Sequence, residues 1–264
     1  MDQTHEHDEH DRSRGQQSHG QANGQHSHGQ ANGHAHGQAN GHGDPTGMNP
    51  EGVTDPAEFW EARYVANRGE RGQVWSGRVN AAVEREVAEL TPGSALELGS
   101  GEGGDALWLA AHGWTVTALD ISATALAVGA AKATHDGLAD RITWVQADLA
   151  AWHPTGEFDL VTAAFLHSPV ELPRDDILRR AASAVAPGGR LLVVGHGAFP
   201  PWSSHREHDH DALPLPTADD VLASLALPDG WTVETCAQVD REVTGPDGER
   251  VTLVDAVLRV RRGV

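Results

Sequence analysis

The sequence has a single cysteine and few basic residues. Cys236 is the only cysteine among 264 residues, so no disulfide can form within the chain, in agreement with a reducing compartment. Lysine and arginine together number 19 against 38 acids, and the formal net charge is −19. Proteins that bind nucleic acid usually carry a basic patch that neutralises phosphates. We therefore expect no nucleic-acid partner and favour a small-molecule ligand.

Long apolar runs are also missing. No stretch approaches the roughly 18 to 20 apolar residues that a membrane span needs. The start, MDQTHEHDEHD, has neither the basic residues nor the apolar run of a secretory signal. These absences predict no membrane partner and a cytoplasmic location.

Residues 1–50 contain almost no large apolar side chains. Repeats of GQANG begin at Gly20, Gly29 and Gly37, and more than half of the 17 histidines lie in this segment. Such a segment cannot bury enough apolar surface to fold, so we expect a disordered tail. Its HEHDEH, HSH and HAH clusters predict weak binding of divalent transition metals, without a catalytic role. The folded domain should then span residues 51–264.

Beyond residue 51, short apolar strands alternate with helices. Before the first strand we expect helices at 55–64 and 76–90, the former opened by an N-cap aspartate and a proline. Strands are expected at residues 95–98, 115–119, 142–146, 158–163 and 190–195, and the helices between and after them at 103–112, 122–134 and 174–185. Each right-handed crossover between parallel strands needs such a helix. The pattern predicts an α/β, doubly wound, Rossmann-like fold.

The C-terminal part of the sequence has a different pattern. A capped helix is expected at 217–225. After it, WTVETCAQVDREV and RVTLVDAVLRV flank TGPDGE, whose composition is typical of a turn between two extended runs. The sequence therefore predicts a seven-stranded sheet, mostly parallel, that ends in an antiparallel hairpin.

A glycine-rich turn, within ALELGSGEGGD at residues 95–105, joins the first of these strands to a helix. Glycine lacks the Cβ that keeps a ligand away from the backbone, so the turn suits close approach of an adenosine-containing ligand. Asp120 ends the next strand, 21 residues after Gly99, where an acid can accept both hydroxyls of a ribose.

The glycines of this turn fit two patterns. One is the dinucleotide pattern G-x-G-x-x-G, which begins at Gly99, and the other is E-x-G-x-G-x-G, which begins at Glu97. The turn alone leaves an NAD(P)-dependent oxidoreductase open. An acid inside the first strand is unusual in a dinucleotide fold, because a buried carboxylate needs a partner. Asp148, in QADL, is well placed to accept from an adenine amine beside Leu149.

Five segments in order resemble the class I S-adenosylmethionine-dependent methyltransferases: ELGSGEG, ALDIS, QADL, FDLVTAAFLH and VAPGGRLLVVGH. The resemblance covers about residues 55–260 and implies methyl transfer from S-adenosylmethionine to a small-molecule acceptor by in-line displacement. The segments before the glycine turn, FWEARY and VWSGRVN, are similar to the small-molecule branch that includes thiopurine and tellurite-resistance methyltransferases. The resemblance implies a cofactor site of Glu97, Gly99, Ser100, Gly101, Gly103, Asp120, Ile121, Asp148, Leu149 and Ala164.

Two histidines follow the fourth and fifth strands, at the edge where doubly wound sheets bind ligands. His167 lies in AFLHSP and His196 in VVGHG. A histidine there can remove a proton from the acceptor, or it can be a hydrogen-bonded structural residue. We expect one of the two, in preference His167, to line the acceptor pocket.

Aromatic residues precede the glycine turn. Trp60 and Tyr64 lie at i and i+4 on one helical face, which predicts a core position for Trp60. We expect Trp75 to contact the cofactor or to belong to a lid, because an aromatic face attracts a sulfonium.

Histidines outside the sheet leave a third class of function open. His208 and His210, within SSHREHDHD, match no fixed metal spacing, so we expect a solvated segment and no structural metal site. A metal-handling protein on a methyltransferase-like scaffold is the remaining alternative, and it would depend on the histidine-rich tail.

Overall fold

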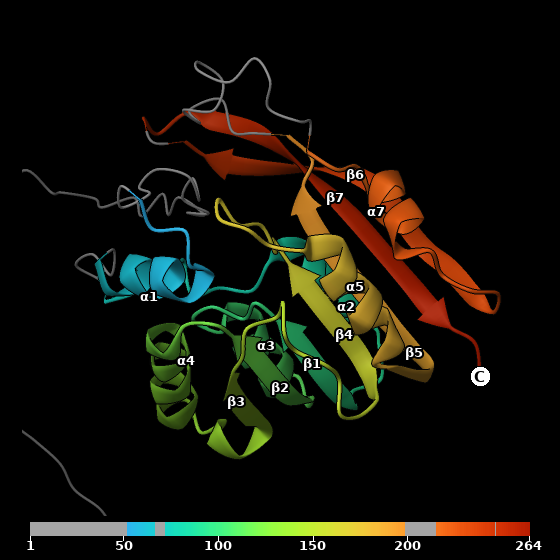
Figure 1. Cartoon of the computed structure of the whole chain (residues 1–264), viewed down its shortest axis with the longest axis horizontal. Coiled ribbons are helices and arrows are strands. Elements are labelled where there is room, and N and C mark those ends of the chain that lie inside the picture. The colour runs from blue at the N-terminus through green and yellow to red at the C-terminus, as the bar shows by residue number, and fades with distance from the viewer. Residues whose placement is uncertain (1–51, 67–71, 199–214, 246) are drawn as a thin grey trace, which may run out of the picture. The chain divides into compact units, whose positions relative to one another are not determined.

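The computed structural model describes residues 52–66, 72–198, 215–245 and 247–264, which are coloured in Figure 1. The predicted tail at 1–50 and the histidine segment at 203–211 lie outside these residues. Within the described part of the chain, no helix has both the length and the apolar character that a membrane crossing requires.

The described residues contain six α-helices and seven strands (Figure 1). The helices are α1 (Pro56–Ala66), α2 (Ala81–Val87), α3 (Gly104–Ala111), α4 (Ala123–His135), α5 (Arg174–Ser183) and α7 (Ala218–Leu225). The strands are β1 (Ser94–Leu98), β2 (Thr115–Asp120), β3 (Ile142–Gln146), β4 (Phe158–Ala164), β5 (Val185–His196), β6 (Trp231–Thr244) and β7 (Arg250–Arg262). A short 3₁₀ turn at Ala139–Arg141 leads into β3.

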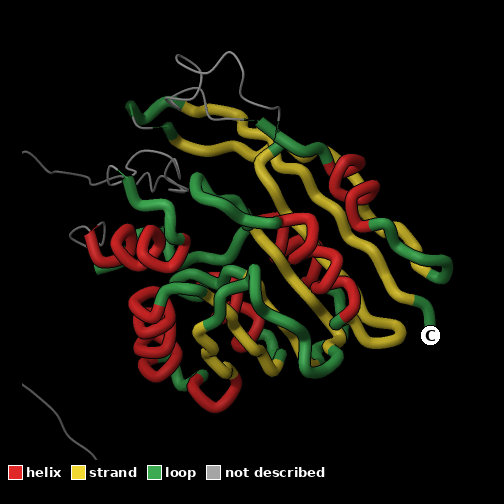
Figure 2. The backbone as a smooth tube through the Cα atoms, in the orientation of Figure 1, coloured by secondary structure: helices red, strands yellow, loops and turns green. Residues whose placement is uncertain are grey.

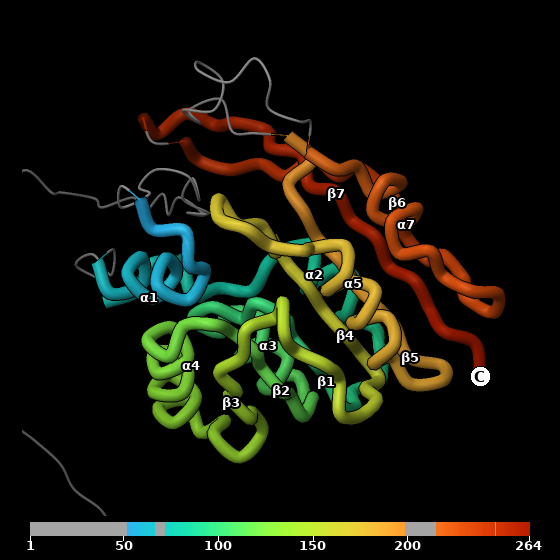
Figure 3. Tube along the Cα trace, in the orientation of Figure 1, coloured from blue at the N-terminus to red at the C-terminus, as the bar shows by residue number. Residues whose placement is uncertain are grey.

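The seven strands form one sheet in the order β3-β2-β1-β4-β5-β7-β6. The first five pair in parallel, whereas β7 pairs antiparallel with both β5 and β6. The colour gradient of Figure 3 shows this, since β7 lies between β5 and β6 although it follows both in the chain. The predicted α/β fold, mostly parallel with a C-terminal antiparallel hairpin, is confirmed.

Helices cover both faces of the sheet, as the secondary-structure colouring of Figure 2 shows. Alternate side chains of β5 point to opposite faces, as the two-residue period of a strand requires. Leu191 and Val193 pack with α5 and α7, and Leu192 and Val194 pack with α2 and α3. In β1, Leu96 and Leu98 enter the first of these clusters, which leaves Glu97 on the α3 face.

Two predicted helices are longer than the structure allows. Of the helix expected at 76–90, only Ala81–Val87 forms. The backbone before this helix is bound by a side chain that follows β1, since Asp105 accepts the backbone N–H of Asn80 at 2.6 Å. The helix expected at 174–185 ends at Ser183 and β5 already begins at Val185. The Pro187-Gly188-Gly189 run lies within β5, next to a shift in the β4–β5 register.

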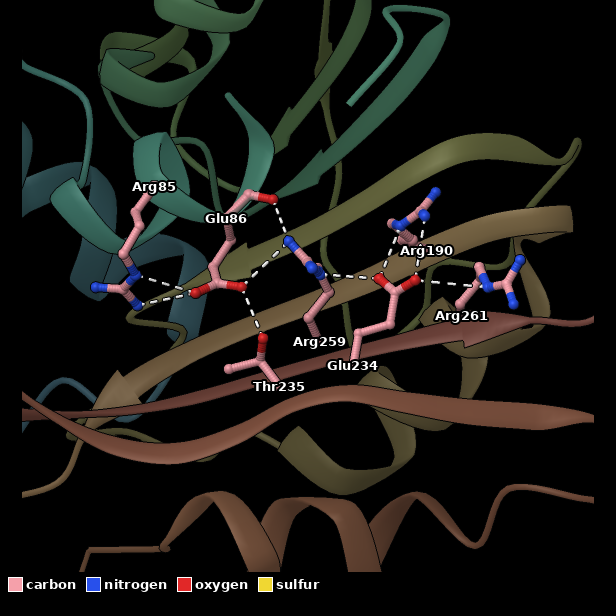
Figure 4. Close-up of polar contacts among 7 residues, drawn as sticks. All are labelled: Arg85, Glu86, Arg190, Glu234, Thr235, Arg259 and Arg261. Carbon is pink, nitrogen blue, oxygen red and sulfur yellow. Dashed lines mark hydrogen bonds and ion pairs between the residues drawn. The ribbon is translucent and has the colours of Figure 1, made fainter. Parts of the chain in front are cut away.

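Ion pairs fasten the hairpin to the rest of the sheet (Figure 4). Glu234 lies where the β6–β7 register shifts between Val233 and Thr235. Its carboxylate meets Arg190 of β5 at 2.8 Å, and Arg259 and Arg261 of β7 at 2.9 and 3.5 Å. Burial opposes ionisation, but the hydrogen bond from Arg190 and the three positive charges lower the pKa of Glu234 below its usual value.

The same network continues to α2 through Arg259. Glu86 of α2, which is buried, pairs with Arg259 at 3.2 Å and with Arg85 at 3.0 Å, and it accepts the hydroxyl of Thr235 at 2.8 Å. Arg259 also donates to the backbone carbonyl of Glu86. One guanidinium thus connects two carboxylates from different elements and fixes α2 against β6 and β7.

Candidate active site

A cavity opens at the carboxyl ends of β1, β2, β4 and β5, the edge at which the sequence predicts a ligand. Its empty volume, open mouth included, is about 1380 Å³. Residues from α1, the segment before α2, the glycine turn, the loops after β2, β3 and β4, and the last residue of β5 line it. Strands and loops far apart in the sequence therefore meet around one space.

The glycine turn has the backbone that its sequence predicts. Gly99, Gly101 and Gly103 have φ values of 70°, 53° and 79°, in the left-handed region that glycine adopts without strain. Gly104 does not share this conformation and begins α3. The positive φ values thus follow E-x-G-x-G-x-G, whereas Gly104 is required for a different reason, since a Cβ there would lie 2.5 Å from the backbone oxygen of Arg78. A Cβ at Gly101 would come within 2.8 Å of the Tyr64 hydroxyl, so the backbone here stays bare beneath α1.

Asp120 joins the ends of β1 and β2. Its Oδ2 accepts the backbone N–H of Gly101 at 2.7 Å, and its Oδ1 accepts that of Ser122 at 2.9 Å. Burial raises the pKa of Asp120 to about 6, although these backbone hydrogen bonds act in the opposite direction. Each carboxylate oxygen has a second lone pair, so the side chain can still accept from a ligand.

Two further carboxylates are buried beside Asp120. Glu97 of β1 lies on the α3 face, and its Oε2 has no hydrogen-bond partner among the described residues. Burial, followed by the charges of Asp105 and Asp120, raises the pKa of Glu97 well above its usual value. Burial likewise raises the pKa of Asp105 to about 6 against the hydrogen bond from Asn80. The cavity wall thus concentrates negative charge that no described lysine or arginine pairs with at ion-pair distance.

Helix α1 covers the glycine turn and is attached to three loops. Tyr64 lies over Gly101 and accepts the indole N–H of Trp75 at 2.8 Å. Glu61 accepts the hydroxyls of Ser122 and Thr124, at 2.6 and 2.5 Å, at the start of α4.

The third attachment of α1 is to the loop after β4. Trp60 donates its indole N–H to Ser168, in the loop after β4, at 3.2 Å. Trp60 lines the cavity and is only partly buried, whereas its neighbour Phe59 is fully buried. The predicted core position of Trp60 is therefore wrong, because the helix is rotated so that Phe59 and Tyr64 face inward.

Both predicted histidines line the cavity, at the ends of β4 and β5. His167 Nε2 accepts the backbone N–H of His196 at 3.4 Å, so the ring proton of neutral His167 lies on Nδ1. Burial, then the charges of Arg174 and His196, lower the pKa of His167 to about 3. His167 is therefore neutral at physiological pH and acts as a hydrogen-bond acceptor that joins the ends of β4 and β5.

Phe165 sits between the histidines and the hairpin. It is one of two described non-glycine residues with positive φ, at 51°, a conformation that costs energy for a bulky side chain. Its ring stacks on His196 with centroids 4.2 Å apart, and Arg241 lies over it at 5.7 Å. Asp255 holds Arg241 at 2.7 Å. The hairpin thereby fixes the aromatic wall of the cavity.

The structure brings almost all predicted site residues to this cavity. Gly103 does not line it. A Cβ there would come within 2.3 Å of Trp144, so this glycine is needed for packing at the start of α3. Asp148 Oδ1 accepts the backbone N–H of Ala150 at 2.8 Å, which fixes the turn after β3. The predicted residues that line the cavity are Trp75, Glu97, Gly99, Ser100, Gly101, Asp120, Ile121, Asp148, Leu149, Ala164, His167 and His196.

Sequence reasoning missed several residues of the site. Asn80 caps α2 by accepting the backbone N–H of Ala82 at 2.8 Å, a pattern visible as an asparagine before AAVE. Glu102 accepts the backbone N–H groups of Val74 and Trp75, each at 2.8 Å. No local pattern indicates this contact, which joins residues 27 or more positions apart.

The residues of the cavity fit S-adenosylmethionine. The molecule carries a sulfonium and an ammonium, and the cavity offers buried carboxylates without a cationic partner among the described residues. Buried Ser100 Oγ and Glu97 Oε2 both lack a hydrogen-bond partner, and bare glycine backbone lies beside them. These are the features that a ligand with cationic and hydroxyl groups would satisfy.

Comparisons with known proteins identify the class. Residues 95–189 match the family described as a methyltransferase domain. Over 147 residues the chain is 33% identical to the 2-heptyl-1-hydroxyquinolin-4(1H)-one methyltransferase of Mycobacteroides abscessus, which covers 54% of this chain and 60% of that protein. Over 114 residues it is 32% identical to the ribosomal RNA small subunit methyltransferase C of Alcanivorax borkumensis, with 41% and 34% covered. The chain thus spans between about a third and three fifths of the length of these curated relatives.

Solved structures agree with this class. A structure from work on the conversion of a disulfide bond into a thioacetal group during echinomycin biosynthesis aligns with a TM-score of 0.56 and 30% identity, over 78% of this chain and 93% of that one. TehB from Haemophilus influenzae shares the fold, with a TM-score of 0.53 and 16% identity over 70% and 63%. The chain belongs to the class I S-adenosylmethionine-dependent methyltransferases.

Proposed function

We propose that this protein transfers the methyl group of S-adenosylmethionine to a small-molecule acceptor. The observation that carries the proposal is one cavity with two chemically different walls. Glu97, Asp120 and the glycine turn form the first wall, and Phe165 and His196 form the second. The similarity to a methyltransferase of a hydroxyquinolone supports a small acceptor.

In this proposal the cofactor lies along the first wall. Asp120 would accept the ribose hydroxyls, the glycine turn would pass the methionine part, and Asp148 with Leu149 would hold the adenine. Ser100, Gly99, Ile121 and Ala164 would complete the contacts. When bound, S-adenosylmethionine supplies a methyl group that its sulfonium makes electrophilic, so the transfer needs little covalent work from the protein.

The chain's own contribution is positioning, exclusion of water and removal of a proton. Tyr64 of α1 lies above the glycine turn and is bonded to Trp75 of the segment before α2. Together they shield the reacting groups from water. We assign the removal of the acceptor's proton to the imidazole of His196. His167 has a pKa of about 3 and is too weak a base at neutral pH, so its role is to hold the backbone of His196.

Isothermal titration calorimetry with S-adenosylmethionine, S-adenosylhomocysteine and NADH tests the cofactor. We expect the first two to bind and Asp120→Ala to weaken them at least about 100-fold, because two hydrogen bonds to a charged group are lost. Asp159→Asn, an exposed acid at the opposite end of β4, should bind as the wild type does. Binding of NADH alone would contradict the proposal.

The roles of the two histidines can be separated by pH. Once an acceptor is known, His196→Gln should lower kcat at least about 100-fold and remove the acid limb of the pH–rate profile. His167→Gln should keep that limb and change kcat less. The reverse result would return the base to His167.

We also propose that the tail binds divalent transition metals weakly, through the histidine clusters of residues 5–36. Calorimetry with Ni²⁺ and Zn²⁺ on the full chain should show several weak sites that disappear when residues 1–50 are removed, with no change in S-adenosylhomocysteine affinity. Unchanged metal uptake in the shortened chain would contradict this. A cytoplasmic location is a further part of the proposal, supported by the single cysteine and testable by cell fractionation.

A further inference from the structure

The acceptor side of the cavity has a composition that restricts the acceptor's chemistry. Its described residues come from α1, the loop after β4 and the end of β5, and they include three aromatic or imidazole rings besides His167: Trp60, Phe165 and His196. We call these three residues the ring wall.

The ring wall is held rigidly. Phe165 stacks on His196 with an interplanar angle of 25°, and His196 in turn stacks on His167 with centroids 5.5 Å apart. Arg241 covers Phe165 and is itself fixed by Asp255, with side-chain exposures of 11% and 3%. A preorganised set of rings favours a flat aromatic ligand over a saturated one, because stacked and edge-to-face contacts add to the effect of burial.

The charge of the residues that line the cavity acts against anions. Arg241 and Arg174, which lie behind the rings, do not line it and are held by Asp255 and by the backbone carbonyl of Leu166. Arg78 is the one lysine or arginine among the described lining residues, and it belongs to the segment beside the glycine turn rather than to the ring wall. An anionic acceptor normally meets arginine, lysine or a cluster of backbone N–H groups. The acids that line the cavity are Glu97, Glu102, Asp105, Asp120, Asp148 and Glu171.

Some of these acids already accept hydrogen bonds from backbone N–H groups, but all of them can repel an anionic acceptor when they are ionised. Glu102, Asp105 and Asp120 accept backbone N–H groups but keep their negative charge when ionised. Glu171 is exposed in the same loop as Ser168, the residue that receives the indole N–H of Trp60. A carboxylate or phosphate on the acceptor would therefore face acids on the cofactor wall and at the mouth beside the ring wall.

We propose that the acceptor is a flat aromatic molecule without an anionic group, held at the ring wall. This rests on the proposed function and names the substrate class of the same site. The same charge pattern disfavours a nucleic-acid acceptor, since phosphates require the basic groups that the described lining has at Arg78 alone.

Three matched alcohols test the inference by calorimetry on the full chain saturated with S-adenosylhomocysteine. They are 2-naphthol, its saturated analogue decahydro-2-naphthol, and 6-hydroxy-2-naphthoate, which adds a carboxylate. We expect 2-naphthol to bind about tenfold tighter than the saturated alcohol, from the aromatic contacts. It should also bind at least about tenfold tighter than the naphthoate.

Variants assign the effect to named residues. Phe165→Leu should reduce the preference for 2-naphthol over its saturated analogue about fivefold, whereas Phe158→Leu, at the other end of β4, should leave it unchanged. Glu171→Gln should improve binding of the naphthoate by about two- to fivefold, and Glu157→Gln, an exposed acid that precedes β4 and does not line the cavity, should not.

The experiment distinguishes failure of the proposed acceptor class from failure of the proposed function. If S-adenosylhomocysteine does not bind, the proposed function fails and the inference fails with it. If it binds but the naphthoate or the saturated alcohol binds as tightly as 2-naphthol, or none of the three binds, only the acceptor class is overturned. Equal effects of Phe165→Leu and Phe158→Leu would also overturn it.

Discussion

Two groups of carboxylates in this chain differ in whether a cation accompanies them. At the cavity, no described arginine or lysine lies at ion-pair distance from Glu97, Asp105 or Asp120. Around the hairpin, Glu86, Glu234 and Asp255 each lie within 3.0 Å of an arginine. Burial raises the pKa values of the first group, while the pKa of Glu234 is lowered. The comparison teaches that a carboxylate with an arginine partner stays ionised, whereas a buried one without such a partner has a raised pKa.

The largest expected effect is on stability and comes from the paired group. Arg259→Met leaves Glu86 without one of its arginines and removes one of the three around Glu234, so the free energy of unfolding should fall by about 3 to 5 kcal/mol. Urea denaturation followed by circular dichroism measures this. S-adenosylhomocysteine affinity should change less than twofold, because the network lies outside the cavity lining.

Arg261→Met is the matched control for this prediction. Arg261 meets the same carboxylate at 3.5 Å but is 45% exposed, so its loss should change the free energy of unfolding by less than about 1 kcal/mol. A similar decrease in the free energy of unfolding in the two variants would mean that the buried contact of Arg259 with Glu86 adds no stability beyond that of an exposed ion pair.

The second expected effect concerns pH and comes from the unpaired group. A carboxyl whose pKa rises on folding contributes stability that is fully present below its unfolded pKa and is lost as the pH rises through its folded pKa. For Asp120 the window runs from 3.8 to about 6. Without ligand, the wild type should therefore lose on the order of 2 to 3 kcal/mol relative to Asp120→Asn between pH 4 and pH 7.

Glu234 gives the opposite sign. Its pKa is lowered on folding, so its contribution is present above the unfolded value of 4.5 and is lost as the pH falls through the folded value. Urea titrations at pH 4, 5, 6 and 7 on Asp120→Asn and Glu234→Gln compare the two. If the difference in the free energy of unfolding between wild type and Asp120→Asn did not depend on pH, the distinction between the unpaired cavity carboxylates and the paired hairpin carboxylates would be wrong.

The smallest expected effect comes from a neutral contact at the cavity. Trp60→Phe keeps a ring but removes the indole N–H that Ser168 accepts, and a neutral hydrogen bond contributes about 1 kcal/mol or less. A double-mutant cycle with Ser168→Ala should give a coupling of about 0.5 to 1 kcal/mol in the free energy of unfolding. A coupling near zero would mean that α1 is held by Glu61 and Tyr64 without this contact.

The parts of the fold that follow local patterns were predictable from the sequence. Strands β1 to β4 lie within one residue of their predicted bounds, because short β-rich runs between glycine turns and helices give a strong signal. Glycine spacing also predicted the conformation of the glycine turn at the cavity, since the need for positive φ is a property of single residues.

The rest depends on contacts between distant parts of the chain. Helical spacing predicts a helix from residue 76, but Asp105 and Glu102 bind backbone N–H groups of residues 74–80 and keep them out of it. The inward rotation of Phe59 over Trp60 follows from how α1 meets the glycine turn. Phe165 adopts its strained turn because β5, His196 and Arg241 surround it, and no neighbouring residue in the sequence signals this.

The position of β7 between β5 and β6 has a consequence for synthesis of the chain. The edge of β5 that β7 covers is complete at His196, but β7 ends only at Arg262. At a translation rate of about 5 to 20 residues per second, that edge waits roughly 3 to 13 s for its partner. During this interval a long apolar strand offers unpaired N–H and C=O groups, and such an edge is a template for association with other chains. The same hairpin that fixes the ring wall thus makes the nascent chain a candidate for chaperone capture until β7 has been made.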